Sequence, residues 1–470
     1  MAIEQAIGLF GGAVQRDGQG VRVTDAAALR TDATDRLVWQ AVFGTPEQRD
    51  AARWLLWELG QSTGARPASI HELYLARGAG KCRNFTVPAI NIRALAYDTG
   101  RAVFRAAARI DAGAIILEIA RSEIAYTDQR PAEYVSVLIG AALREGWTAP
   151  LFIQGDHCQV NQKKYAADPV GEVSEVKKLI AEEVLAGFYN IDVDTSTLVD
   201  LSFPTLDEQQ RLNYVHCAEI TQFIREREPD GVTVSVGGEI GEVGHKNSTV
   251  EELHAFMQGF NRTLAAYDGN LAGLSKISVQ TGTSHGGVVL PDGTIAKVKL
   301  DLDALEALSR AAQQDYGMGG AVQHGASTLP GDAFGNFPRI ETVEIHLATN
   351  FQNIVFDHPS LPAALRDEMY AWLEVNATAE KKDGDTPEQF QYKARKRAIG
   401  PFKRQLWTLD AEVRGAISTT LEAQFGFLFE QLNVRGTAAL VREYVHAPLR
   451  HYGAGLPAMA LAVDDPDAGE

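Results

Sequence analysis

Three histidines stand at positions where a barrel fold would bring them to one metal ion. His157, His285 and His324 each follow a short apolar run, in the segments PLFIQGDHC, KISVQTGTSHGG and GAVQHGAS. The C-terminal ends of the strands of a parallel α/β barrel meet at one mouth, so residues distant in sequence can share a ligand there. Three imidazoles with a fourth position left open are typical of a catalytic zinc site. The spacing therefore predicts a metal centre.

Asp156, directly before His157, is the candidate residue for proton transfer. Neighbouring strand residues point to opposite faces, but where a strand ends the chain turns and both can face the mouth. A carboxylate beside a metal can exchange a proton with an oxygen that the metal polarises. It could equally cap the next helix or orient a ligand histidine. The residues alone leave both roles open.

A further group of residues suits a phosphate. Gly286, Gly325, Ser327 and Thr349 follow the last three predicted strands and offer backbone N–H groups and hydroxyls. Glycine lets the backbone approach an anion closely, and barrels often hold phosphate in the loops after strands seven and eight. The pattern indicates a phosphorylated ligand.

Eight short apolar runs alternate with helical stretches after residue 80. The runs lie at 85–92, 114–120, 150–156, 187–194, 233–239, 276–282, 320–325 and 344–350, and helical spacing marks 94–111, 173–186, 206–227 and 302–316. Nearly continuous apolar character is expected of strands that are covered on both faces. Eight strand–helix units predict an α/β fold of the (β/α)8 TIM barrel type. An open doubly wound sheet is disfavoured, because its GxGxxG fingerprint is absent.

The two flanks of the barrel are predicted to be helical. Helices are expected at 35–42, at 46–59 and from 410 to 432. The chain then divides into an N-terminal helical extension (1–84), the barrel (85–360), a C-terminal helical extension (361–456) and a disordered acidic tail (457–470).

Composition and charge exclude several classes of protein. The chain has 45% hydrophobic and 22% charged residues, as a globular protein does, and its net charge of −17 argues against a nucleic-acid or anionic membrane partner. Its apolar stretches are far shorter than the roughly 20 residues that cross a bilayer. Three cysteines without a CxxC spacing, and an N-terminus without a secretory pattern, favour a cytoplasmic setting.

Six segments fall in order at the predicted strand ends. They are PAIN (88–91), GDHC (155–158), GGEIGEVG (237–244), GTSHGG (282–287), QHGAS (323–327) and HLATN (346–350). Together they resemble the class II, metal-dependent fructose-bisphosphate aldolases over roughly residues 85–355, and GPFKRQLW with the last helix is similar to the C-terminal part of that family. One such motif is modest evidence, whereas six in order are strong evidence for the fold and the zinc site.

The resemblance implies a zinc-dependent aldolase site. His157, His285 and His324 would bind Zn²⁺, which would stabilise the enediolate of a donor similar to dihydroxyacetone phosphate. Asp156 would exchange a proton with the aldehyde oxygen of the acceptor. A monovalent cation as activator and a homodimer or homotetramer are expected on the same basis.

Further roles follow from the same resemblance. Glu239 and Asp194 match carboxylates that hold the zinc in a retracted position, with Asp192 as the alternative to Asp194. Asn91 would belong to the substrate-binding residues, and the glycines and hydroxyls described above would hold the donor phosphate.

Departures from the family pattern fall on the substrate pocket. His346 is assigned to substrate binding, but it stands where the family usually has an Asn that touches the enediolate. Ala120 replaces a common Ser, and Val288 and Val289 fill the place of a basic residue. These differences leave the metal ligands and Asp156 intact and widen the range of candidate substrates.

The residue that abstracts the donor's proton should come from the loop GEVGHKNSTVEE. Its Glu251 lies in the first turn of the next helix, where Ser248 and Glu251 are expected to form a capping box. Glu242 and His245 therefore remain as candidates for the base, with no choice between them. In part of the resembled family a C-terminal Arg from a neighbouring subunit meets the distal phosphate of the substrate. Lys403 or Arg404, in the basic C-terminal run, could do so here, and a solvated helix face is the alternative.

The predicted activity is zinc-dependent, reversible aldol cleavage of a ketose bisphosphate. The first candidate is cleavage of fructose 1,6-bisphosphate to dihydroxyacetone phosphate and glyceraldehyde 3-phosphate, a step of glycolysis and gluconeogenesis. The alternatives are another phosphorylated ketose, a metal-dependent isomerase or epimerase on the same barrel, and a non-catalytic relative that binds a metal or a sugar phosphate. Retention of Asp156 beside the ligands favours an enzyme.

Overall fold

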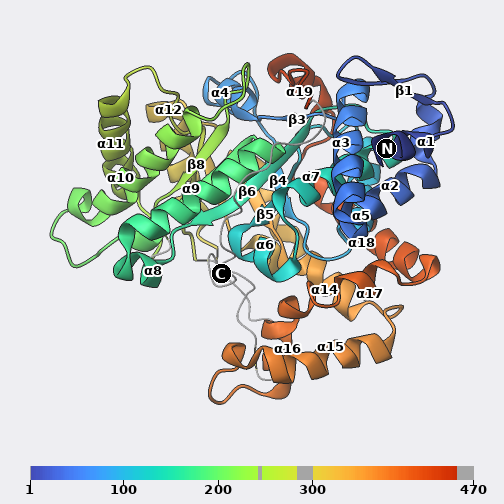
Figure 1. The fold of residues 1–470 in the computed structure, drawn as a ribbon. Coiled ribbons are helices and arrows are strands. Elements are labelled where there is room, and N and C mark those ends of the chain that lie inside the picture. The colour runs from blue at the N-terminus through green and yellow to red at the C-terminus, as the bar shows by residue number, and fades with distance from the viewer. Residues whose placement is uncertain (1, 242–245, 283–289, 291–299, 453–470) are drawn as a thin grey trace.

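Eight parallel strands close into a barrel in the computed structural model of the chain (Figure 1). The structure describes residues 2–241, 246–282, 290 and 300–452. Each strand pairs with the next along the chain, and β11 pairs with β4 to complete the circle. The strands are β4 (Val87–Asn91), β5 (Ile116–Ala120), β6 (Leu151–Gln159), β7 (Asn190–Asp194), β8 (Ser235–Glu239), β9 (Lys276–Val279), β10 (Ala321–Gln323) and β11 (Glu344–Leu347). All eight lie within or overlap the predicted runs, so the (β/α)8 prediction is confirmed.

Helices surround the barrel, as the periodic stretches of sequence predict. They are α5 (Ala96–Ala108), α6 (Arg121–Thr127), α7 (Pro131–Glu145), α8 (Gln162–Ala167), α9 (Pro169–Ala186), α10 (Leu206–Arg225), α11 (Val250–Tyr267), α12 (Leu302–Tyr316), α13 (Asn336–Arg339) and α14 (Thr349–Asp357). The start of α11 differs from the prediction. Thr249, not Ser248, caps this helix, because its hydroxyl accepts from the N–H of Glu252 while the Glu252 carboxylate accepts from the N–H of Thr249. Ser248 instead accepts a hydrogen bond from the N–H of Gln280.

The N-terminal residues add more than the two predicted helices. They form α1 (Ala2–Gly8), a hairpin of β1 (Val14–Asp17) and β2 (Gly20–Val23), α2 (Asp32–Phe43), α3 (Pro46–Thr63), β3 (Pro67–Ala68) and α4 (His71–Gly78). The hairpin was not predicted; Gly18, with φ of +58°, provides its tight turn. α2 and α3 pack on α7, so this extension covers one side of the barrel.

The C-terminal extension is helical, as predicted. Its elements are α15 (Ala363–Asn376), α16 (Pro387–Ala394), the 3-10 turn η7 (Arg395–Ala398), α17 (Lys403–Trp407), α18 (Ala411–Gln431) and α19 (Ala438–Tyr444). α18 packs on α5 and α19 contacts α4, whereas α14 to α17 form a separate group of helices below the N-terminal ones in Figure 1. The indole N–H of Trp54 donates to the carbonyl of Tyr452 at 2.7 Å, which ties the end of the described chain to α3.

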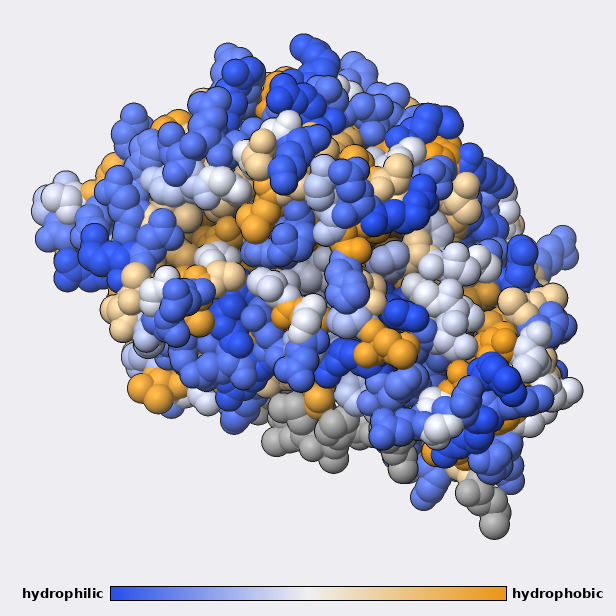
Figure 2. Space-filling model, turned by 90° about the horizontal axis from the view of Figure 1, so that it is seen from above, coloured by the Kyte–Doolittle hydropathy of each residue, from blue (hydrophilic) through white to orange (hydrophobic). Residues whose placement is uncertain are grey.

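The outside of the molecule is mainly polar. In Figure 2 hydrophilic residues cover most of the face seen from above, and apolar residues stand on it in small separate groups. Among the described residues no helix is both long and apolar enough to span a membrane.

A buried carboxyl lies where α9 packs on β6. Glu183 of α9 is fully buried, and a Cβ atom at Gly155 would lie 2.6 Å from one of its oxygens, so glycine is needed there. The thiol of Cys158 lies 3.3 Å from the same carboxyl. Burial raises the pKa of Glu183 to about 8. The side chain therefore carries a proton at neutral pH.

The proton on Glu183 makes folding stability depend on pH. The folded state holds this proton up to about pH 8, whereas an ordinary Glu releases it near its usual value of 4.5. The contribution of protonated Glu183 to the free energy of unfolding is therefore present at low pH and is lost as the pH rises through 8. We expect Glu183→Gln to gain stability relative to the parent between pH 5 and 9, measured by the unfolding midpoint in urea. The exposed Glu368→Gln variant on α15 is the matched control, and parallel pH curves for parent and Glu183→Gln would contradict this account.

Candidate metal and acid–base centre

The mouth of the barrel collects buried polar side chains from strands that are far apart in sequence. β6 supplies Asp156 and His157, β7 supplies Asp194, β8 supplies Glu239, and His324 follows β10 directly. Each of these side chains is less than 10% exposed. The structure therefore brings together the described residues that the sequence predicted to bind metal and transfer protons. His285, Gly286, Glu242 and His245 lie outside the described residues.

A β-bulge directs Asp156 and His157 to the same side. Gly155 pairs with Ile191 and Cys158 with Val193, so Asp156 and His157 together oppose the single residue between those two. His157 adopts φ of +41°, in the left-handed region that non-glycine residues rarely occupy. The sequence predicted a strand that ends at 156, which is wrong: β6 continues to Gln159, and the bulge re-aims the side chains instead. Backbone strain of this kind is concentrated at functional sites.

His157, Glu239 and His324 have the geometry of a metal site. One ligand atom from each lies within 4.8 Å of the others, and all three side chains are buried. The Nδ1 atom of His157 lies 3.5 Å from Glu239 and 3.3 Å from Asp194. Two imidazoles and a carboxylate are ligands that zinc and similar divalent ions accept. The residues present therefore fit a bound divalent cation.

The electrostatic field at His157 also favours a cation. Burial alone would lower the pKa of this imidazole, but Asp156, Asp194 and Glu239 outweigh burial and raise the pKa well above its usual value. A proton and a metal ion compete for the same ring nitrogen. The charge that holds a proton on the ring is thus available to hold a divalent ion there.

Two neighbours hold the Asp156 carboxylate in place. The side-chain amide of Asn91 donates to Oδ2 at 2.8 Å, and Nδ1 of His346 lies 3.0 Å from Oδ1. Burial opposes ionisation, but His157 and His346 outweigh it and keep the pKa of Asp156 well below its usual range. Asn91 in turn donates to Glu123 of α6 at 2.9 Å, so its own orientation is set. Asp156 is therefore an oriented, ionised group that can accept a proton.

His346 lies between two carboxylates. Its second nitrogen, Nε2, is 2.7 Å from Glu344, two residues earlier on β11, and its ring stacks on that of His324 with centroids 4.2 Å apart. The carboxyl groups of Glu118 and Asp156, with the hydrogen bond to Glu344, outweigh burial and raise the pKa of His346 well above its usual value. His346 thus links Asp156 to the interior of the barrel.

Below the mouth, the barrel encloses an ammonium group. Lys276, the first residue of β9, is completely buried and contacts Glu344 at 2.5 Å, Asp192 at 2.8 Å and the side-chain oxygen of Gln154 at 2.7 Å. These carboxylates outweigh burial and raise the pKa of Lys276. Gly237 leaves the room for the pair, because a Cβ atom there would lie 2.4 Å from Asp192. Asp192 is therefore occupied by Lys276, whereas Asp194 faces His157.

The predicted phosphate residues meet at two adjacent loops. Gly325 adopts φ of +66° directly after His324, and the hydroxyl of Ser327 accepts a hydrogen bond from the N–H of Ala348 at 2.7 Å. Thr349 is the first residue of α14, so it sits beside this contact. Gly325, Ser327 and Thr349 are all partly exposed and can be reached by a ligand.

Lys403 lies in a different setting from the strand ends. It is 7% exposed, and its ammonium contacts the carboxylate of Glu133 and the carbonyl of Asp128, both at the corner between α6 and α7. A distal-phosphate role for Lys403 stays a prediction.

Several members of the centre escaped sequence reasoning. Lys276, Glu344, Gln154 and Glu118 lie inside strands and form one hydrogen-bonded group, in which Gln154 donates to Glu118 at 2.7 Å and to Glu344 at 2.9 Å. The available signal was a charged residue inside an otherwise apolar strand, as in KISV, ILEIA and EIHL. In a strand covered on both faces, such a residue has to be paired.

Comparison with known proteins agrees with this centre. Residues 78–399 match the family described as "Fructose-bisphosphate aldolase class-II". The chain therefore belongs to the class II fructose-bisphosphate aldolase family, a family of metal-dependent barrel proteins. No curated protein matches the chain.

Solved structures show the same fold at low sequence identity. A probable tagatose 6 phosphate kinase from Sinorhizobium meliloti is 16% identical with a TM-score of 0.53, and covers 76% of this chain and 99% of its own. A fructuronate-tagaturonate epimerase from Cohnella laeviribosi is 12% identical with a TM-score of 0.50, over 75% and 82%. A fructose-bisphosphate aldolase from Campylobacter jejuni is 16% identical with a TM-score of 0.46, over 80% and 95%. For the first two, the likeness at these identities establishes the fold alone.

Removal of the buried ammonium tests the internal charge pairing. Lys276→Met would leave Asp192 and Glu344 buried without their cation, and breaking a buried pair in this way costs about 3–5 kcal/mol. We expect a correspondingly lower free energy of unfolding in urea, and partial recovery in the double variant Lys276→Met/Glu344→Gln. A single variant as stable as the parent, or a double variant less stable than the single one, would contradict the pairing.

Proposed function

We propose that this protein catalyses metal-dependent, reversible aldol cleavage of a phosphorylated ketose, with fructose 1,6-bisphosphate as the first candidate substrate. The observation that carries the proposal is the placement of an ionised, doubly held Asp156 beside His157 and His324. Family membership adds the reaction class. The resulting products would be dihydroxyacetone phosphate and glyceraldehyde 3-phosphate.

The metal would be zinc, bound by His157, His285 and His324. Glu239 and Asp194 would provide the alternative, retracted position, since both lie within 3.5 Å of His157. A bound divalent ion supplies Lewis-acid stabilisation of the negative charge that develops on the donor half of the substrate.

Asp156 would move the proton of the acceptor half. In cleavage, the C4 hydroxyl gives its proton to the Asp156 carboxylate while the C3–C4 bond breaks, its electron pair goes to the donor half, and the C4–O bond becomes a carbonyl. In condensation the same proton returns. The low pKa of Asp156 makes the ionised form available, and Asn91 and His346 orient its two oxygens. Asn91 and His346 are therefore positioning residues as well as substrate-binding candidates.

The remaining roles concern the donor half. Glu242 or His245 would exchange the proton at C3 of the donor, which completes the proton balance of the reaction. Gly286, Gly325, Ser327 and Thr349 would hold the donor phosphate through N–H groups and hydroxyls. The accessible contact of Ser327 with the N–H of Ala348 supports that assignment.

A second phosphorylated ketose is the alternative substrate. It is favoured by His346, a larger and cationic side chain where the resembled family usually has Asn. A cationic ring beside Asp156 changes which hydroxyl arrangement the pocket accepts. Tagatose, sedoheptulose and deoxy-sugar phosphates are the candidates.

Metal dependence of cleavage is the first test. We expect triose phosphate release from fructose 1,6-bisphosphate to disappear with EDTA and to return with zinc, because the charge on the donor half is no longer stabilised without the ion. Release by the EDTA-treated protein at an unchanged rate would contradict the proposal. If the zinc-loaded protein cleaves only another ketose phosphate, the substrate is corrected and the reaction class stands. Interconversion of epimers without triose release would overturn the aldolase assignment.

Asp156→Asn separates proton transfer from metal binding. Asparagine keeps the size of the side chain but cannot accept the proton, so kcat should fall by roughly 10²- to 10⁴-fold with zinc content unchanged. Exposed Asp367→Asn on α15 serves as the control and should keep the parental rate. A parental kcat in Asp156→Asn would remove Asp156 from the mechanism.

A further inference from the structure

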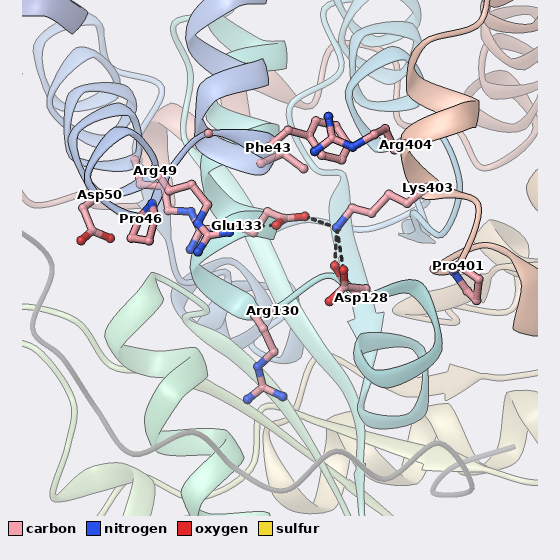
Figure 3. A pocket seen from close by; sticks show the side chains of 14 residues that line it. Phe43, Pro46, Arg49, Asp50, Asp128, Arg130, Glu133, Pro401, Lys403 and Arg404 are labelled. Atoms are coloured by element: carbon pink, nitrogen blue, oxygen red, sulfur yellow. Dashed lines mark hydrogen bonds and ion pairs between the residues drawn. The ribbon is translucent and has the colours of Figure 1, made fainter. Parts of the chain in front are cut away.

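A cavity of about 690 Å³ lies outside the barrel mouth, where three distant parts of the chain meet (Figure 3). The turn between α2 and α3, the corner between α6 and α7, and residues 400–404 before and within α17 line it. None of its lining residues belongs to a barrel strand. Its size is that of a pocket for a small ligand, which is about 300–1,000 Å³.

Cations outnumber acids around this basic cavity. Arg49, Arg53, Arg130, Lys403 and Arg404 line it, against Asp50, Asp128 and Glu133, and Arg130 is paired with Glu182 outside the lining. The chain as a whole carries a net charge of −17, so a local excess of positive charge stands against the average of the molecule. Cationic side chains gathered in one hollow favour an anionic ligand.

Two of the cations already share one buried carboxylate. Glu133 accepts from Arg53 at 3.3 Å and also contacts the ammonium of Lys403, and Figure 3 shows the lysine reaching toward it. The single negative charge of Glu133 thus pairs with the positive charges of both Arg53 and Lys403. Burial lowers the pKa of Arg53, while the carboxylate of Glu133 acts in the opposite direction.

Arg49 and Arg404 keep the hydrogen-bond donors of their side chains available. Within the described ranges, neither the Arg49 nor the Arg404 side chain has a carboxylate within 4.0 Å or a hydrogen-bond acceptor. The guanidinium group of Arg404 lies over the ring of Phe43, with its central carbon 4.5 Å from the ring centroid. A guanidinium that is oriented by an aromatic ring and has unused N–H groups is well suited to bind a phosphate.

We propose that the basic cavity is a second anion-binding site, for a small phosphorylated molecule, separate from the substrate phosphate loops. Arg49 and Arg404 would bind the phosphate oxygens directly, and Arg53 and Lys403 would add charge from the wall. The ligand would bridge the N-terminal extension, α6 and the C-terminal extension. The last two are already joined by a hydrogen bond from the N–H of Gly400 to the carbonyl of Tyr126 at 3.0 Å.

The site has a direct structural connection to the centre in the barrel. Asp128 and Tyr126 belong to the end of α6, and Glu123 at its start holds Asn91, which holds Asp156. A ligand in the basic cavity therefore binds against the same short helix that helps to orient the proton-transfer residue.

Titration calorimetry of the zinc-loaded protein tests the proposal, with inorganic phosphate, pyrophosphate and glucose 6-phosphate as probes. We expect at least one probe to bind, and the double variant Arg49→Gln/Arg404→Gln to weaken its binding by about tenfold or more, because two charge-assisted contacts are lost. The control Arg211→Gln/Arg310→Gln removes the same charge from exposed helix positions and should leave binding unchanged. A preference for pyrophosphate identifies a polyphosphate ligand, and a preference for glucose 6-phosphate identifies a phosphate ester.

Three outcomes would overturn the site. Equal weakening in both double variants would show only general electrostatic attraction. Loss of all probe binding in Ser327→Ala, with full binding in Arg49→Gln/Arg404→Gln, would place the phosphate at the barrel loops, which supports the proposed function and not the cavity. A changed oligomeric state of Arg49→Gln/Arg404→Gln in light scattering, with probe binding intact, would make the cavity an interface between copies of the chain.

Discussion

The ammonium of Lys276, enclosed in the barrel, is the interaction on which the rest of the centre depends. Four acidic residues, Glu118, Asp156, Asp192 and Glu344, lie within this interior, and Lys276 and His346 are the cations that face them. Only as many acids can ionise as there are charges to pair with them. Lys276 and His346 lower the pKa of Glu344 to about 2, and His157 and His346 keep Asp156 ionised, whereas burial raises the pKa values of Glu118 and Asp192. Charge balance thus decides which of these carboxyls ionise most readily.

This balance explains how the chain accommodates His346. A histidine at this place would be an unpaired buried base if its neighbours were apolar, but Glu344 beneath it and Asp156 beside it bind one nitrogen each. Glu344 is in turn kept ionised by Lys276, the first residue of β9. The three residues therefore form one connected unit, which reaches Asp156 through His346. On the other side, Asp194 and Glu239 lie 3.3 and 3.5 Å from Nδ1 of His157, and His157, Glu239 and His324 have the geometry of a site for a divalent ion.

The fold could be predicted from the sequence because the patterns that indicate strands and helices are local. Strands covered on both faces are nearly continuous apolar runs, helices carry a 3.6-residue period, and their alternation leaves few topologies. Other features depend on contacts that no local pattern encodes. The bulge at Asp156 and His157 follows from pairing with β7, and Thr249 rather than Ser248 caps α11 because Gln280 takes the Ser248 hydroxyl. The pairing of Lys276 joins strands more than a hundred residues apart in sequence, as its bond to Gln154 illustrates.

The N-terminal and C-terminal extensions lie far apart in sequence and meet only in space. Local sequence patterns therefore do not encode the contacts between them. α2 and α3 pack on α7, α18 packs on α5, and residues 400–404 reach the end of α6, so additions from both termini converge on one side of the barrel. Buried ion pairs at that junction, such as Lys403 with Glu133, are favourable only when each charge finds its partner, so they fix how the extensions dock. Arg404 also packs on the ring of Phe43 in α2, but neither Arg49 nor Arg404 has a carboxylate partner among the described residues. These two guanidinium groups are the ones to which the proposed anion of the basic cavity would bind.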